Sequence, residues 1–175
     1  MKNIYEELVK LIKINELTIY QDLDGCLCDF EKAFENLGHG TFEEVEGQSY
    51  VEDPAKAWNL IAKAGEKYWS EMPWMSDGKF LWKYVKQFNV KILSAPIHAK
   101  SSHTGKKKWV QKNLGRDIEL ILSPSNKKYR YADSKSILID DRESNIKEWR
   151  KAGGIGILHT DAKTTIDKLR RITFK

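Results

Sequence analysis

Short apolar runs recur along most of the chain, and each is about the length of one β-strand. Between them, apolar residues recur at the three- and four-residue spacing of an amphipathic helix. This pattern predicts strands at residues 17–20, 90–93, 118–122, 136–139 and 156–158. It predicts helices at residues 6–14, 29–37, 78–87, 104–114, 144–152 and 162–172.

Strands that alternate with helices are typical of the α/β class, in which helices cover both faces of a parallel sheet. We therefore expect a doubly wound parallel sheet. Ligands of such sheets bind beyond the carboxyl ends of the strands. The residues that follow each predicted strand are therefore the first place to look for chemistry.

One stretch, from about Gly40 to Asp77, interrupts this alternation and has no strand signal. Asp53 and Pro54 have the residue types of a helix N-cap and first helical position, and they predict a helix that runs to Ala64. We interpret this part of the chain as a small helical cap inserted after the first strand. The expected division is a core of residues 1–30 and 77–175 and a cap of residues 31–76.

Length and composition fit one soluble globular domain of 175 residues. The apolar runs are too short to cross a membrane, and the mixture of Glu and Lys near the start is unlike a signal peptide, which predicts a cytoplasmic protein. The formal charge of +5 is spread along the chain, so phosphorylated small molecules and nucleic acid both remain possible partners. Cys26 and Cys28 are expected to be small buried thiols.

Two carboxylates, Asp22 and Asp24, come directly after the first predicted strand. Residues i and i+2 of an extended segment point the same way, and Gly25 lets the chain turn sharply behind them. Taken alone, this segment could be a polar turn. A second acidic pair, Asp140 and Asp141, follows another strand in the same manner, and this repetition favours a site.

Polar residues at other strand ends complete a constellation that suits phosphoryl transfer. Asp22 could attack phosphorus and form an aspartyl-phosphate, and Asp24 could protonate the departing oxygen and then activate water. Ser94 and Lys128 would stabilise the charge on the transferred group. Carboxylates and a phosphate in one site need a hard cation, for which Mg²⁺ is the expected choice.

The four segments resemble the motifs of the haloacid dehalogenase (HAD) superfamily of phosphatases: a DxDG after the first strand, a Ser or Thr, a Lys and an acidic pair. The resemblance covers residues 17 to about 159 and implies a Rossmann-like core with a cap. It implies phosphate contacts from Ser94, Ala95 and Lys128. The expected metal ligands are Asp22, Asp24 and Asp140, with Asp141 and Arg142 supporting them. Lys127 and Arg130 remain alternatives to Lys128 as the motif lysine.

The segments DLDGCLCDF, WSEMPW and ILIDDRESNIKEW look like the 5'(3')-deoxyribonucleotidase group within that superfamily. That group holds a pyrimidine base against an aromatic-lined cap. The resemblance implies a magnesium-dependent hydrolase of (deoxy)nucleoside monophosphates. The candidates for the aromatic pocket here are Phe30, Trp58, Trp69 and Trp74.

Two other functions are compatible with the sequence. A polynucleotide 3'-phosphatase could use Lys106, Lys107, Lys108 and Lys112 to bind a strand. A non-catalytic nucleotide-binding protein could keep the fold without turnover, although it would have little reason to retain Asp24.

Several weaker signals have structural interpretations. The run from Gly105 to Lys108 lacks the spacing of a phosphate-binding loop and is interpreted as a solvated helix start. The glycines near residue 154 follow a helix and not a strand, so no nicotinamide cofactor is expected. His98 and His103 are interpreted as solvated bystanders.

Overall fold

The computed structural model describes residues 16–47, 55–97 and 99–173. Five parallel strands form one sheet in the order β3-β2-β1-β4-β5. The strands are β1 (Thr18–Gln21), β2 (Asn89–Ser94), β3 (Leu120–Leu122), β4 (Ser136–Asp140) and β5 (Ile155–Leu158). The predicted α/β class and parallel sheet are confirmed, with β3 beginning two residues later than expected.

Helices cover both faces of this sheet, as its apolar strands require. They are α6 (Gly78–Val85), α7 (Lys100–Asn113), α8 (Glu143–Lys151) and α9 (Ala162–Thr173), with a 3₁₀ helix η1 at Ser125–Tyr131. On one face, Ile19 and Ile137 share a buried cluster with residues of α6, α7 and α9. On the other face, Leu138 packs with Trp149 of α8. The sheet is therefore doubly wound, since its crossover helices lie on opposite faces.

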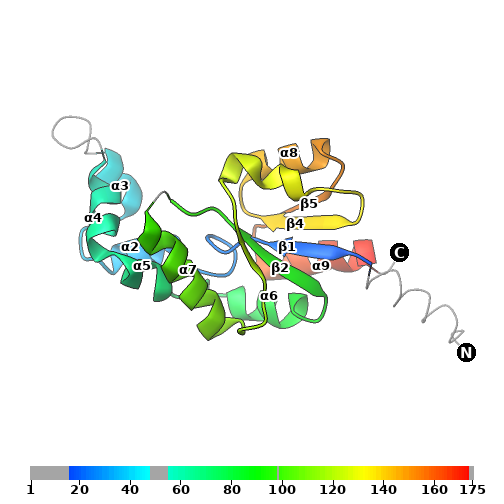
Figure 1. The fold of residues 1–175 in the computed structure, drawn as a ribbon, viewed down its shortest axis with the longest axis horizontal. Helices are drawn as coiled ribbons and strands as arrows, with labels where there is room; N and C mark the ends of the chain where they lie inside the picture. The colour runs from blue at the N-terminus through cyan, green and yellow to red at the C-terminus, as the bar shows by residue number, and fades with distance from the viewer. Residues whose placement is uncertain (1–15, 48–54, 98, 174–175) are drawn as a thin grey trace, which may run out of the picture.

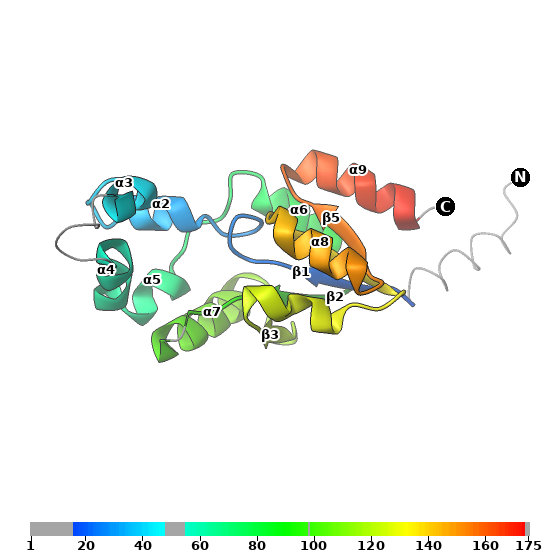
Figure 2. The same ribbon diagram turned by 90° about the horizontal axis from the view of Figure 1, so that it is seen from above.

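Four short helices between β1 and α6 lie together beyond the carboxyl end of the sheet (Figures 1 and 2). They are α2 (Phe30–Glu35), α3 (Phe42–Gly47), α4 (Lys56–Ala64) and α5 (Glu66–Ser70). Here "cap helices" refers to these four. Helix α5 packs closely on α7 of the core at Gly105, where a Cβ would overlap the Cβ of Trp69.

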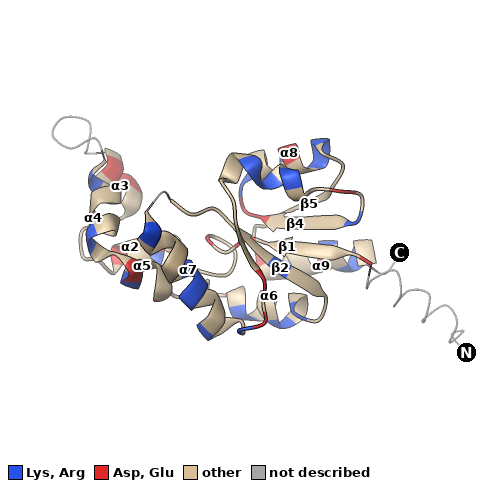
Figure 3. Cartoon of the chain, viewed as in Figure 1, with Lys and Arg blue, Asp and Glu red and all other residues tan. Residues whose placement is uncertain are grey.

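The basic residues are spread over several helices. Figure 3 shows Lys and Arg on α4, α6, α7, α8 and α9, and Asp and Glu on α3. The positive charge of the described residues therefore comes from many elements and is not gathered into one arm.

Some expectations fall outside the described residues: the helix at 6–14, the helix start at Asp53 and Pro54, and His98. Helix α7 begins at Lys100, four residues before the predicted start at Thr104. Cys26 and Cys28 are buried and free, as expected. In the part of the chain that the structure describes, no helix is long and apolar enough to cross a membrane.

Candidate active site

The two acidic pairs meet because β1 and β4 are neighbours in register, with Gln21 opposite Ile139. The backbone N–H of Asp22 donates to the carbonyl of Ile139 over 2.9 Å, which places Asp22 beside Asp140. Gly25 has φ of +75°, and a Cβ there would lie 2.5 Å from Oδ2 of Asp141. Glycine is required at this turn both by its conformation and by the closeness of Asp141.

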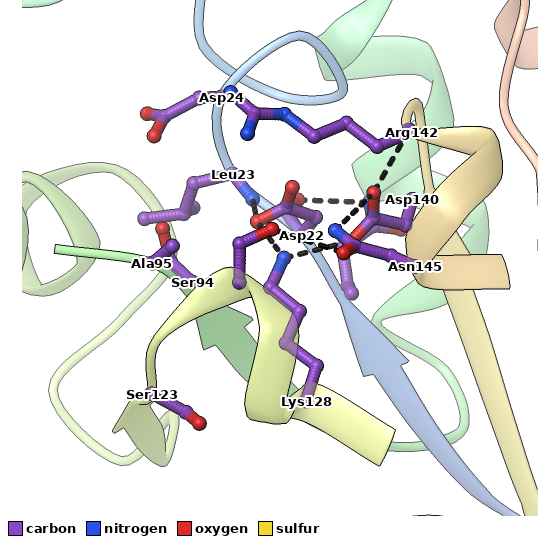
Figure 4. A network of polar contacts seen from close by, with 12 residues as sticks. Asp22, Leu23, Asp24, Ser94, Ala95, Ser123, Lys128, Asp140, Arg142 and Asn145 are labelled. Atoms are coloured by element: carbon purple, nitrogen blue, oxygen red, sulfur yellow. Dashed lines mark hydrogen bonds and ion pairs between the residues drawn. The ribbon is translucent and has the colours of Figure 1, made fainter. Parts of the chain in front are cut away.

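Lys128 lies between these carboxylates (Figure 4). Its Nζ is 2.9 Å from Oδ1 of Asp22 and 2.7 Å from Oδ2 of Asp140. The 3₁₀ turn of η1 buries Lys128, while the neighbouring Lys127 and Arg130 are exposed. Of the three candidates for the motif lysine, the structure therefore brings Lys128 to the acidic residues.

Asn145, which the sequence pattern does not single out, holds Asp140 in place. Its Nδ2 is 3.0 Å and 2.9 Å from the two carboxylate oxygens, and the backbone N–H of Arg142 donates to Oδ1 over 2.9 Å (Figure 4). Asn145 lies one helical turn before the buried Trp149. A polar residue on the apolar face of a helix was the signal that could have revealed it.

Asp22, Asp140 and Asp141 form a cluster that fits a divalent cation. Each offers a carboxylate oxygen, and these oxygens lie within 4.8 Å of one another. Oxygen ligands of this kind are those that Mg²⁺ prefers. The carboxylate of Asp24, an expected ligand, lies outside the cluster and points away from it, whereas Asp141, expected only to support the site, belongs to it (Figure 4).

Burial dominates the electrostatics of the cluster. It raises the pKa of Asp22 to about 7, helped by the charges of Asp140 and Asp24 and opposed by Lys128. Burial also raises the pKa of Asp141, and the charge of Asp140 adds to this effect. Burial alone would lower the pKa of Lys128, but Asp22 and Asp140 outweigh it and the pKa is raised. Removal of either partner would leave a costly buried charge.

A second buried lysine, Lys106 of α7, holds Asp24, and this corrects the interpretation of Gly105 to Lys108 as wholly solvated. Lys106 is fully buried and forms an ion pair with Asp24. Its Nζ also donates to Oγ of Ser94 over 2.8 Å and to the carbonyl of Ala95 over 3.0 Å. The Sγ of Cys28 lies 3.6 Å from the other carboxylate oxygen of Asp24, so both oxygens have partners.

Ser94 and Ala95, two of the residues expected to contact the phosphate, both accept a hydrogen bond from Lys106. Ala95 lines the cavity beside the acidic residues, and its carbonyl accepts from Lys106. Ser94 is buried, and its Oγ accepts from the same lysine, which leaves its hydroxyl proton to donate elsewhere. Their contact with a phosphate therefore stays a prediction.

A cavity of about 710 Å³ joins the acidic residues to the cap helices. Asp22, Asp24 and Lys128 line it at one side, and Asp141 and Arg142 also reach it. This volume lies within the range of roughly 300–1,000 Å³ that is common for small-molecule sites. The cavity therefore offers room for a small ligand next to Asp22.

Three of the four aromatic candidates, Phe30, Trp58 and Trp69, line this cavity, and His103, expected to be a bystander, lines it too. Trp74, the fourth candidate, is not among the lining residues of this cavity. Its ring packs on Trp109 with centroids 4.9 Å apart, and its N–H donates to Asn113 over 3.1 Å. These contacts fix Trp74 against α7.

Comparison with known proteins identifies the fold. A haloacid dehalogenase-like family hydrolase from Xanthomonas campestris superposes with a TM-score of 0.60 at 9% identity, over 90% of this chain and 92% of that one. The chain has the fold of these hydrolases. No family model matches the sequence, and no curated protein matches it.

Two further solved structures share this HAD fold. A hydrolase from Streptococcus pneumoniae TIGR4 has a TM-score of 0.53 at 13% identity, over 90% of this chain and 98% of that one. A HAD-hydrolase from Bacillus subtilis, bound to magnesium, has a TM-score of 0.52 at 10% identity, over 91% of this chain and 99% of that one. Identities this low relate the folds and leave the chemistry to be argued from the site.

Proposed function

We propose that this chain is a HAD-superfamily phosphatase that hydrolyses small phosphomonoesters with Mg²⁺ as its cofactor. One observation carries the proposal: Lys128 lies 2.9 Å from Asp22 and 2.7 Å from Asp140, next to a cavity that Asp22 lines. A buried lysine shared by two carboxylates suits a site that must neutralise a phosphate beside a carboxylate nucleophile.

The proposed reaction has two steps, and Asp22 and Asp24 take part in both. A carboxylate oxygen of Asp22 attacks phosphorus, the bond from phosphorus to the leaving oxygen breaks, and Asp24 gives that oxygen a proton. Water then attacks phosphorus, the bond from phosphorus to the Asp22 oxygen breaks and restores the Asp22 carboxylate, Asp24 accepts a proton from the water, and inorganic phosphate leaves. The contacts of Lys106 and Cys28 with Asp24 would hold its carboxylate at the cavity between these steps.

Asp22, Asp140 and Asp141 would hold the cation. When bound, Mg²⁺ offsets the negative charge that the carboxylates and the substrate phosphate bring together. Burial raises the pKa of Asp22 to about 7 in the absence of a cation, so added positive charge would favour the ionised nucleophile. Asn145 keeps Asp140 oriented through both of its oxygens.

A nucleoside monophosphate is the substrate that the cavity supports best. Phe30, Trp58 and Trp69 line the side away from Lys128, and the side chain of Trp58 is 37% exposed. An exposed indole face offers a stacking surface for a flat base. A phosphate at Asp22 and a base near Trp58 would occupy the two sides of one cavity.

The test is phosphate release from ribo- and deoxynucleoside 5'- and 3'-monophosphates and from a 3'-phosphorylated oligonucleotide, with and without Mg²⁺. We expect magnesium-dependent release from a mononucleotide, and its loss in Asp22→Asn. Asp117→Asn, which removes an exposed carboxylate outside the cavity lining, is the matched control and should keep full activity.

The rival functions predict other outcomes of the same panel. Release from the oligonucleotide alone would indicate a polynucleotide 3'-phosphatase. No release from any substrate, combined with measurable nucleotide binding, would indicate a non-catalytic nucleotide-binding protein. Activity that survives in Asp22→Asn would refute the aspartyl-phosphate mechanism.

A further inference from the structure

The cavity has two electrostatically different sides. Lys128 and Arg142 lie near the catalytic carboxylates. The side formed by the cap helices and the residue before them has four aromatic rings, two carboxylates and no Lys or Arg among its described lining residues: Asp29, Phe30, Glu31, Phe42, Trp58 and Trp69. The chain has 30 Lys and Arg against 25 Asp and Glu, so an acidic, aromatic wall departs from its overall composition.

The aromatic rings of this wall pack against one another and do not surround an open centre. The rings of Phe42 and Trp58 are edge to face with centroids 5.0 Å apart, and those of Phe30 and Phe42 are 5.4 Å apart. The ammonium of Lys106 already lies over the ring of Trp69, 5.2 Å from its centroid, so that ring is not free for a ligand cation. The exposed part of Trp58 instead offers one flat surface, which suits a planar ring.

The two carboxylates of the wall can only accept hydrogen bonds when ionised. One oxygen of Asp29 accepts from the backbone N–H of Lys32 over 2.8 Å, as the N-cap of α2. A cap uses a single acceptor, so the other oxygen can face a ligand. Burial raises the pKa of Glu31, and a backbone hydrogen bond at Phe42 partly offsets this rise. The charges of Asp29 and of two further glutamates raise the pKa of Glu31 further. Negative charge is therefore concentrated on this wall.

We propose that the cap side of the cavity selects a planar heterocycle with an exocyclic amino group, as in cytosine and adenine, over its carbonyl counterpart. The proposal rests on the proposed nucleotidase function and adds the class of base. At the exocyclic position, an amino group would donate to Asp29 or Glu31, whereas the carbonyl of uracil or hypoxanthine would place two acceptors face to face. The ring N–H that uracil and hypoxanthine carry instead lies one ring position away. The same negative charge would disfavour a phosphodiester extension on this side.

The decisive experiment compares kcat/KM within matched pairs of substrates. The pairs are dCMP with dUMP and dAMP with dIMP, which differ in the exocyclic group and in the proton on the adjacent ring nitrogen. We expect at least about a tenfold preference for the amino partner in one pair or both, because the carbonyl partner has no donor at the exocyclic position and turns an acceptor toward the carboxylate. Equal rates in both pairs, or a preference for the carbonyl partners, would overturn the proposal.

Variants of the wall separate recognition from a general structural effect. Asp29→Asn keeps an N-cap acceptor, and Glu31→Gln keeps the side-chain shape, but both amides can donate to a carbonyl. The double variant should lose most of the preference while its activity on the carbonyl partners is kept or raised. Glu43→Gln removes a nearby exposed charge outside the lining and should keep the preference. A uniform loss on all four substrates in the double variant would contradict selective recognition.

Failure of the proposed function can be told apart from failure of this inference. If no nucleotide is hydrolysed, the nucleotidase proposal fails. Calorimetric titration of dCMP and dUMP into Asp22→Asn then tests recognition alone. Tighter binding of dCMP by about tenfold would support the amino-selective wall, and equal binding or no binding of either would overturn it.

Discussion

Two buried lysines contact the segment that follows β1, and they differ in their partners. Lys128 contacts two carboxylates, Asp22 and Asp140, whose side chains are 8% and 0% exposed. Lys106 contacts one carboxylate, Asp24, whose side chain is 28% exposed, together with two neutral oxygens at the end of β2. Both lysines themselves are almost completely buried.

The cost of losing a lysine–carboxylate ion pair should therefore increase with the burial of the carboxylate. A charge without access to water depends on its counter-ion, whereas a partly exposed charge can be solvated instead. We expect Lys128 to be essential to the integrity of the site. Lys106 has a different task, since it ties the orientation of Asp24 to α7 and to the end of β2.

The largest effect is expected from Lys128→Met, which keeps the volume of the side chain and removes its charge. It leaves Asp22 and Asp140 without their shared cation, so the free energy of unfolding should fall by about 3 kcal/mol. Phosphate release should fall by at least about a hundredfold. Urea unfolding and steady-state kinetics measure the two effects.

Lys127→Met is the matched control for that variant, because the neighbouring side chain is exposed. Its stability and activity should stay near those of the unchanged protein. If Lys127→Met and Lys128→Met behave alike, the role assigned to Lys128 is wrong.

A smaller effect is expected from Lys106→Met. Asp24 keeps partial access to water, so the loss of unfolding free energy should be about 2 kcal/mol. Turnover should fall by about tenfold because the carboxylate is no longer held in one orientation. Lys107→Met, which changes the exposed neighbour on α7, is the control. A loss as large as that of Lys128→Met would remove the distinction between the two lysines.

The most discriminating effect is also the smallest. Mg²⁺ bound by Asp22, Asp140 and Asp141 would replace part of the positive charge that Lys128→Met removes, but it would not restore the ion pair that Lys106→Met removes. At about five times the Kd for Mg²⁺, the cation should stabilise Lys128→Met by about 1 kcal/mol. Thermal unfolding with Mg²⁺ and with EDTA measures this. A stabilisation of Lys128→Met no larger than that of Lys106→Met would show that Mg²⁺ does not replace the charge of Lys128, and no stabilisation of either variant would argue against a cation at this cluster.

Much of this arrangement follows from the sequence, because parallel strands bring their carboxyl ends to one edge of a sheet. The positions of Asp22 and Asp140 directly after predicted parallel strands thus sufficed to predict that the two converge, whereas Lys127 and Arg130 remained alternatives to Lys128. Lys106 was missed because three successive lysines resemble a solvated helix surface. It lies three and four residues before the buried Trp109 and Val110, so it shares their face of α7.

The aromatic residues show a second limit of the sequence. Spacing and residue type place Trp58 and Trp74 in the same segment, yet one lines the cavity and the other packs on Trp109. Which face an aromatic ring covers depends on the helix that packs against it, and α7 is distant in the sequence. Such contacts between remote elements carry no local pattern.

The central position of β1 has a consequence for how the protein becomes active during its synthesis. Asp22 emerges early, but β1 is flanked by β2 on one side and by β4 on the other, and Asp140 closes the second of these strands. The proposed nucleophile thus lacks its partner Asp140 until the last third of the chain has been made. A nascent or truncated chain that stops before β4 would carry Asp22 and Asp24 without the carboxylates that complete the cluster. The carboxylate cluster would then be completed in one step, when β4 pairs with β1.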